Sequence, residues 1–206
     1  MIELSAEQLE RAQKLLGHIP GAVPKAIANA INRAAEGGRT DAVKKTREVY
    51  TISPSRIRET MEIRKAQTSN LSAAVISRGQ PRALSYFKIK PSKPTKRRPK
   101  DGVYAQVKYG AGGIIAKSFV AKMANGHIGV FNRSAVKYMK DQGPRPKKRG
   151  AGNTKGRFAI DQHYGPSVPQ MLGNQSVIKF VEEGAKRRLD ERLDHEINRI
   201  LRGYGK

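Results

Sequence analysis

Lysine and arginine side chains gather in the middle of this 206-residue chain, in numbers suited to contact with phosphate groups. Residues 63–160 carry 23 Lys and Arg against two acids, Asp101 and Asp141, whereas the remainder of the chain holds 18 basic and 15 acidic residues. Such clustered charge repels itself unless a phosphate backbone, an anionic membrane or an acidic protein neutralises it. The sequence therefore predicts a polyanionic partner, with nucleic acid as the first candidate.

Two predicted loops, residues 88–100 and 137–157, hold much of this charge. Prolines keep the first loop extended and glycines make the second flexible, so both are expected to reach a partner. Lys and Arg neutralise phosphate without reading the base sequence, which predicts nonspecific binding. The candidate contact residues are Lys88, Lys90, Lys93, Lys96, Arg97, Arg98 and Lys100 in the first loop and Arg145, Lys147, Lys148, Arg149, Lys155 and Arg157 in the second.

Four aromatic residues, Tyr86, Phe87, Tyr104 and Tyr109, lie near the first basic loop in the sequence. Aromatic rings can stack on nucleic-acid bases. Aromatic residues on alternating strands more often form the core and cross-strand pairs, so both roles stay open.

The sequence offers no constellation of residues for catalysis. Its four histidines are scattered and it has no cysteine, which argues against a metal site. Gly110, Gly112 and Gly113 lack the Lys-Ser or Lys-Thr pair of a phosphate-binding loop, so they are interpreted as a turn. The six acids of the last predicted helix alternate with seven basic residues, as on a solvated, salt-bridged face. We expect no enzymatic activity, no cofactor and no metal ion.

Composition also bears on the compartment in which the chain folds. No segment approaches the ~18 consecutive apolar residues of a membrane span, and residues 1–16 lack the basic start and apolar run of a signal peptide. The absence of cysteine suits a reducing cytoplasm. We expect a chain that can fold in a reducing cytoplasm, that is not secreted and that has no membrane partner.

The first third of the chain shows helical periodicity. A capping-box pattern precedes apolar residues at helical spacing in residues 5–16. A longer helix is predicted for residues 24–49, although Gly37 and Gly38 each weaken it by about 1 kcal/mol relative to alanine. Serine followed by proline then predicts a short helix over residues 54–61.

From residue 69 onward, short apolar runs separated by turn residues predict strands of an antiparallel, meander-like sheet. The expected strands are residues 71–76, 84–89, 103–109 and 128–131. Helices before this region and a long amphipathic helix after it make the predicted fold class α+β, with long basic loops leaving the central sheet.

The last predicted helix, residues 176–202, carries an apolar residue at every fourth position. Each step of four residues advances the apolar stripe by about 40° around the helix, so no single flat surface can cover it. We expect the beginning of this helix to pack on the sheet and its end to meet another element or a neighbouring subunit. The candidate oligomer-interface residues are Leu189, Leu193, Ile197 and Leu201.

Taken in order, these features resemble the prophage minor tail protein Z family of long-tailed bacteriophages. Residues 22–34 resemble the opening helix of that family, and residues 118–133 resemble its Phe, spacer, Asn-Gly turn and following strand. Asn125-Gly126 within this stretch predicts a type I′ turn between antiparallel strands. The proline segment at residues 165–169 and the closing charged helix complete the resemblance, whereas residues 137–157 form a longer loop than the family pattern requires.

The resemblance implies a virion structural protein of the tail or neck, assembled in the host cytoplasm. It implies a tail-completion role at the head-proximal end of the tail, where the protein helps to join tail to head and holds or guides the DNA end. The implied assembly is a homo-oligomeric ring, expected to be a hexamer. Its implied partners are tail terminator, head-completion or connector proteins, together with phage DNA bound nonspecifically.

The resemblance also implies one tail-completion domain over residues 1–206, with a helical part (1–66), a basic part of sheet and loops (67–165) and a C-terminal helix (166–206). The alternative hypothesis is a stand-alone, sequence-nonspecific nucleic-acid-binding protein that uses the same loops without forming a ring. Oligomeric state and location in the virion distinguish the two.

Overall fold

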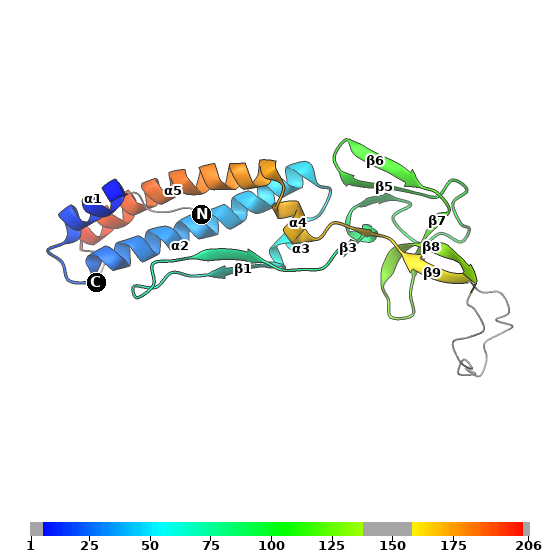
Figure 1. Cartoon of the computed structure of the whole chain (residues 1–206), viewed down its shortest axis with the longest axis horizontal. Coiled ribbons are helices and arrows are strands. Elements are labelled where there is room, and N and C mark those ends of the chain that lie inside the picture. Colours follow the sequence, from blue (N-terminus) through cyan, green and yellow to red (C-terminus); the bar gives the residue numbers. More distant parts are fainter. Residues whose placement is uncertain (1–5, 138–157, 204–206) are drawn as a thin grey trace. The chain divides into compact units, whose positions relative to one another are not determined.

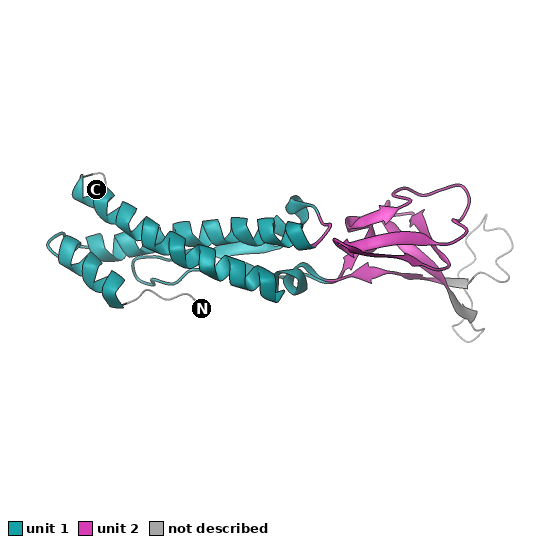
Figure 2. Cartoon of the chain, turned by 90° about the horizontal axis from the view of Figure 1, so that it is seen from above, with its two compact units in different colours: residues 1–49, 53–80, 167–206 teal, residues 50–52, 81–166 magenta. Residues whose placement is uncertain are grey.

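The computed structural model describes residues 6–137 and 158–203, and these form two compact units. Unit 1 comprises residues 1–49, 53–80 and 167–206, and unit 2 comprises residues 50–52 and 81–166 (Figure 2). Helices and several small antiparallel sheets make up these units, so the predicted α+β class is confirmed. The predicted single antiparallel sheet is divided into two two-stranded and two three-stranded sheets.

Unit 1 is built on two long antiparallel helices that lie side by side (Figure 1). Its elements are α1 (Ala6–Leu16), α2 (Ala22–Val49), α3 (Pro54–Arg58), the hairpin β1 (Met61–Arg64) and β2 (Ala74–Ser77), α4 (Val168–Leu172) and α5 (Gln175–Leu201). The helices predicted from periodicity within residues 5–16, 24–49 and 176–202 are confirmed. The short helix predicted for residues 54–61 ends at Arg58, because Met61 is buried and pairs with Ser77 in the hairpin instead.

Helices α2 and α5 approach closely because small residues face each other between them. A Cβ atom placed on Gly184 of α5 would lie 2.6 Å from Asp41 Oδ2 of α2, so any larger residue would displace the Asp41 carboxylate. Gly37 and Gly38 of α2 face Arg188 and Ala185 of α5, respectively. The two glycines that weaken α2 as an isolated helix therefore lie where α5 packs against it.

A partly buried ion pair fixes the register of this helix contact. Asp41 is 8% exposed, and the Arg188 guanidinium donates to both of its carboxylate oxygens, with Nη2 lying 2.9 Å from Oδ1. The hydrogen bond to Asp41 is the main cause of the raised pKa of Arg188. Bidentate pairing of this kind restricts the relative positions of its two partners more than a point contact does.

The far end of α5 packs in a core shared with α2 and α1. This core contains Ala12, Leu16, Ala22, Ala26, Ile27, Ala30, Ala34, Leu189, Leu193, Ile197 and Ile200. The prediction that the beginning of α5 packs on the sheet is wrong, because Val181 and Ala185 face Gly38 of α2. The prediction that its end meets another element is confirmed, since Arg11 of α1 forms an ion pair with Asp194.

The predicted oligomer-interface residues fall into two groups. Leu189, Leu193 and Ile197 are 5%, 2% and 2% exposed, because α1 and α2 already cover them within the chain. Leu201 is 46% exposed and remains available to a partner.

Unit 2 contains two three-stranded meanders. Its elements are β3 (Arg82–Ala83), the 3-10 turn η1 (Leu84–Tyr86), β4 (Lys88–Lys90), β5 (Val103–Lys108), β6 (Ala111–Ile115), β7 (Ser118–Lys122), β8 (Ile128–Lys137), β9 (Phe158–Gln162) and β10 (Tyr164–Gly165). The strand orders are β4-β5-β6 and β7-β8-β9, and β10 pairs with β3. The strands predicted at residues 103–109 and 128–131 are confirmed, whereas residues 84–86 form η1 rather than strand.

Two turns differ from the sequence-based prediction. Gly110 alone of its glycine cluster lies in a turn, with φ of 77°, whereas Gly112 and Gly113 pair with β5 as part of β6. The β7–β8 hairpin predicted around Asn125-Gly126 is confirmed, but its turn is not type I′. That turn requires positive φ at both central residues, and among the described non-glycine residues Lys117 alone has positive φ. A five-residue loop joins the strands instead, closed by Met123 N–H donating to His127 O at 2.7 Å.

The α2–α5 contact yields a paired test with two glycine substitutions. Gly184→Ala should lower the free energy of unfolding by about 1–3 kcal/mol, because its methyl group overpacks the contact and displaces Asp41. Chemical denaturation followed by far-ultraviolet circular dichroism, which reports the helices of unit 1, measures this change.

Gly38→Ala is the matched control on the facing helix. Its Cβ would lie 3.8 Å from Val181 Cγ1 and 3.9 Å from Ala185 Cβ, which are ordinary contact distances. Since alanine favours the helix over glycine by up to about 1 kcal/mol, this variant should be as stable as the parent or more stable. Equal destabilisation by both variants would contradict the assignment of the closest helix approach to Gly184 and not to Gly38.

Candidate functional site

Unit 2 carries most of the excess positive charge of the chain. It contains 20 Lys and Arg against 3 acids, whereas unit 1 contains 21 Lys and Arg against 14 acids. We call the exposed members of this set the unit 2 basic residues. They are Lys88, Lys90, Lys93, Lys96, Arg97, Arg98, Lys100, Lys108, Lys117, Lys122 and Arg133.

Strand β4 positions the first two of these residues. Ile89 is 7% exposed, while Lys88 and Lys90 on either side of it are exposed. Because side chains alternate along a strand, one buried isoleucine directs both lysines to the opposite, solvent-facing side of the sheet. The strand register places Lys88 opposite Gln106 and Lys90 opposite Tyr104, which fixes the positions of both lysines along β5.

The loop after β4 presents the next five basic residues to solvent. Lys93, Lys96, Arg97, Arg98 and Lys100 are all exposed. Two local contacts order this loop: Thr95 Oγ1 donates to Arg97 O at 2.6 Å, and the Arg98 guanidinium lies 5.8 Å from the centre of the Phe119 ring. The prediction of an exposed basic loop is therefore confirmed for residues 91–100, whereas residues 88–90 of the predicted loop form β4.

The two units differ in how many of their described charged side chains form ion pairs. In the described part of the chain, ion pairs occur in unit 1, where Asp41, Glu36, Glu48, Glu59, Asp194 and Glu196 pair with Lys or Arg. Hydrogen bonds from Lys65 and Lys45 lower the pKa of Glu36 and Glu48, respectively. No described Lys or Arg side chain of unit 2 pairs with a carboxylate. The charge of unit 2 is therefore left uncompensated by the described residues.

Ser118 supports the strands that carry this charge. Its side chain is fully buried, and Oγ donates to Ile115 O at 2.6 Å while accepting from Val103 N–H at 2.9 Å. The hydroxyl thereby ties the start of β5 to the end of β6. Sequence reasoning did not identify this role, because one serine at the start of a strand gives no sign of burial.

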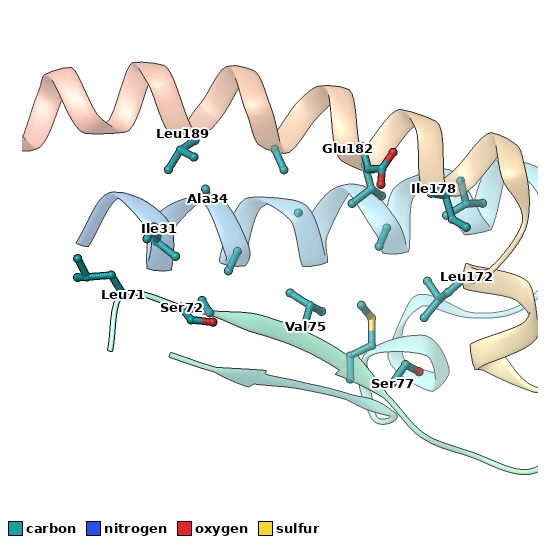
Figure 3. Close-up of a pocket in the computed structure, with 18 residues that line it drawn as sticks. Ile31, Ala34, Leu71, Ser72, Val75, Ser77, Leu172, Ile178, Glu182 and Leu189 are labelled. Atoms are coloured by element: carbon teal, nitrogen blue, oxygen red, sulfur yellow. The ribbon is translucent and has the colours of Figure 1, made fainter. Parts of the chain in front are cut away.

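Unit 1 contains an open apolar groove of about 660 Å³ (Figure 3). Its lining comes from α2, α4, α5 and the β1–β2 hairpin, and includes Ile31, Ala34, Leu71, Val75, Ile178 and Leu189. Leu71, Val75 and Ile178 remain 39%, 39% and 40% exposed. Sequence reasoning did not identify this groove, because it depends on how the hairpin lies beside the two helices.

The remaining predicted site residues divide as follows. Arg145, Lys147, Lys148, Arg149, Lys155 and Arg157 lie outside the described residues. Phe87 is buried, and Tyr86 lies beside Arg82, whose guanidinium is 5.9 Å from its ring centre. Tyr109 is 59% exposed, and Tyr104 is partly exposed on β5.

Residues 6–137 and 158–203 contain neither a cluster of metal-binding side chains nor a membrane-spanning helix. No group of three or more His, Asp or Glu side chains in these ranges is arranged to hold a metal ion. None of the helices described is both long enough and apolar enough to cross a membrane.

Comparison with known proteins identifies a family to which the chain is similar. The sequence profile of the family described as prophage minor tail protein Z matches residues 7–206. No curated protein and no solved structure matches the chain significantly.

The buried hydroxyl of Ser118 provides a test of how β5 is held. Ser118→Ala should destabilise unit 2 by about 1–3 kcal/mol, because the Val103 N–H loses its buried acceptor. Amide hydrogen exchange should show faster exchange at Val103 and its neighbours. Ser92→Ala, which removes an exposed hydroxyl from the basic loop, should leave the exchange rates unchanged.

Proposed function

Because the chain belongs to the prophage minor tail protein Z family and is therefore a structural protein of a phage tail, we propose that it completes the head-proximal end of that tail. There it helps to join tail to head and holds or guides the DNA end. Tail terminator, head-completion or connector proteins are its neighbours, and assembly takes place in the host cytoplasm.

The observation that carries this proposal is the uncompensated charge of unit 2. Unit 2 carries 17 excess positive charges in 89 residues. Their mutual repulsion destabilises the folded unit, and contact with neutral surfaces alone would not offset it. Phosphate backbones provide a high density of negative charge and accept Lys and Arg without regard to base sequence. A surface of this kind suits a tail component that must hold any genome end.

We further propose that the protein acts as a homo-oligomeric ring, with six copies as the expected number. A ring presents the unit 2 basic residues of every copy to the same DNA. Unit 1 suits the contact between copies, because most of its charge is balanced and its apolar groove exposes Leu71, Val75 and Ile178. The exposed Leu201 can add to this contact.

Charge removal from the basic loop tests the DNA contact. Replacing Lys93, Lys96, Arg97 and Arg98 by glutamine should weaken duplex binding and make the log-log salt slope shallower by about 0.9 for each phosphate that is no longer neutralised. Fluorescence anisotropy with labelled duplex across a salt series measures both quantities. Replacing Lys179, Lys186, Arg187 and Arg192 of α5, which are also exposed, removes the same net charge from unit 1 and is the matched control.

Equal weakening of duplex binding in both variants would show that net charge alone acts, and would contradict a specific role for the loop. Duplex binding by a monomer that is absent from purified particles would favour the stand-alone nucleic-acid-binding alternative.

Self-association through the groove is tested by Val75→Glu and Ile178→Glu, which place a charge on half-exposed apolar positions. Analytical ultracentrifugation should show oligomers for the parent chain and a shift toward monomer for both variants, because the charge must be desolvated in the contact. Leu9→Glu, at a position with the same 39% exposure as Val75 but outside the groove lining, should keep the parent distribution of oligomers.

Immunogold labelling of intact particles should place the protein where the tail meets the head. A parent chain that stays monomeric with its tail partners present would overturn the ring.

A further inference from the structure

The solvent-facing side of the β4-β5-β6 sheet combines lysines with an aromatic ring. The strand register places Lys90, Tyr104 and Ile114 in one row across the three strands, and Lys88, Gln106 and Gly112 in the neighbouring row. Cross-strand partners share a face, and residues two apart on a strand also share it. These six residues therefore lie on one side of the sheet, which we call the lysine–tyrosine face.

This side of the sheet is open to solvent. Lys88, Lys90 and Gly112 are exposed, and Ile114 is 61% exposed. The opposite side carries Ile89 and Val103, which are 7% and 0% exposed. The sheet thus buries one side in unit 2 and leaves the lysine–tyrosine face uncovered by the described residues.

Tyr104 lies along this face instead of projecting away from it. A Cβ atom on Gly112 would lie 2.0 Å from Tyr104 Oη and 2.5 Å from its Cζ, so the end of the ring occupies the space that a side chain at this position would fill. Gly112 therefore allows the ring to rest across β6. A ring supported in this way offers its outer surface as a platform.

The charges on this face all have one sign. The described residues of unit 2 include two acids, Asp101 and Asp161, and neither belongs to β4, β5 or β6. Lys88 and Lys90 flank the tyrosine with positive charge. An anionic ligand that also has flat apolar groups is complementary to this combination.

We propose that the lysine–tyrosine face binds single-stranded nucleic acid, with Tyr104 stacking on a base and Lys88 and Lys90 contacting backbone phosphates. This inference rests on the proposed DNA contact of unit 2 and specifies which form of nucleic acid this face accepts. Bases in a duplex are stacked on one another, whereas bases of a single strand are free to stack on a protein ring. An acidic polypeptide would satisfy the lysines but would gain less from a ring lying flat on the sheet.

The test compares a labelled oligothymidine with a duplex of the same length, using the full-length chain and fluorescence anisotropy. Tyr104→Ala should weaken oligothymidine binding about fivefold or more, the factor expected for one stacked base, and should leave duplex binding nearly unchanged. Tyr104→Phe keeps the ring and should retain the parent affinity. The double variant Lys88→Gln, Lys90→Gln should weaken oligothymidine binding and reduce its salt dependence.

A second measurement does not depend on the folding of any variant. Photocrosslinking of the parent chain to an oligonucleotide containing 5-iodouracil, followed by mass spectrometry, should identify Tyr104 as the crosslinked tyrosine. Crosslinks confined to other tyrosines, equal weakening of both ligands in Tyr104→Ala, or displacement of the oligonucleotide by an acidic peptide at equal concentration would overturn the proposal.

These outcomes separate this inference from the proposed function. If duplex binding depends on the basic loop while Tyr104→Ala leaves oligothymidine binding unchanged, the lysine–tyrosine face is excluded and the DNA contact of unit 2 stands. If the parent chain binds neither ligand at low salt, both proposals fail together.

Discussion

The close contact between α2 and α5 is the constraint on which the rest of the molecule depends. Glycine and alanine at the facing positions let the two helices approach, and the Asp41–Arg188 pair fixes their register. These two helices hold unit 1 together, whereas residues 81–166 supply none of the residues of its helical core and belong to a second unit. The large positive charge of unit 2 is therefore kept out of the packing that stabilises the helices.

This separation gives the two units different electrostatic roles. In unit 1 several of the described carboxylates form ion pairs with Lys or Arg, and an apolar groove is open to solvent. Unit 2 has few carboxylates, and none of its described lysines and arginines forms an ion pair with one. The two units therefore offer chemically distinct surfaces, an apolar groove in unit 1 and a set of exposed basic residues in unit 2.

Periodicity in the sequence is sufficient to predict α1, α2, α5 and β5, because their apolar spacing reflects one buried side, and a short apolar run predicts the first residues of β8. It was insufficient where a partner decides the structure. Gly112 and Gly113 have the composition of a turn, yet they form β6 because β5 pairs with them. Met61 continues a helical pattern, yet it lies in β1 because it pairs with Ser77 of β2. Local periodicity does not reveal a partner from another strand. The exposed basic loop was predictable from charge alone, whereas the apolar groove and the support of Tyr104 by Gly112 depend on tertiary packing.

The Asp41–Arg188 pair joins residues 147 positions apart, and this separation sets an order of events during synthesis. Helix α5 is synthesised after residues 81–166. Helix α2 therefore lacks its partner helix while the strands of unit 2 leave the ribosome. Both three-stranded meanders pair strands that are consecutive in the chain, and such local contacts form quickly. Vectorial translation therefore favours unit 2 folding first, while α2 keeps an unpaired apolar stripe that is open to chaperones or to premature association until translation reaches α5.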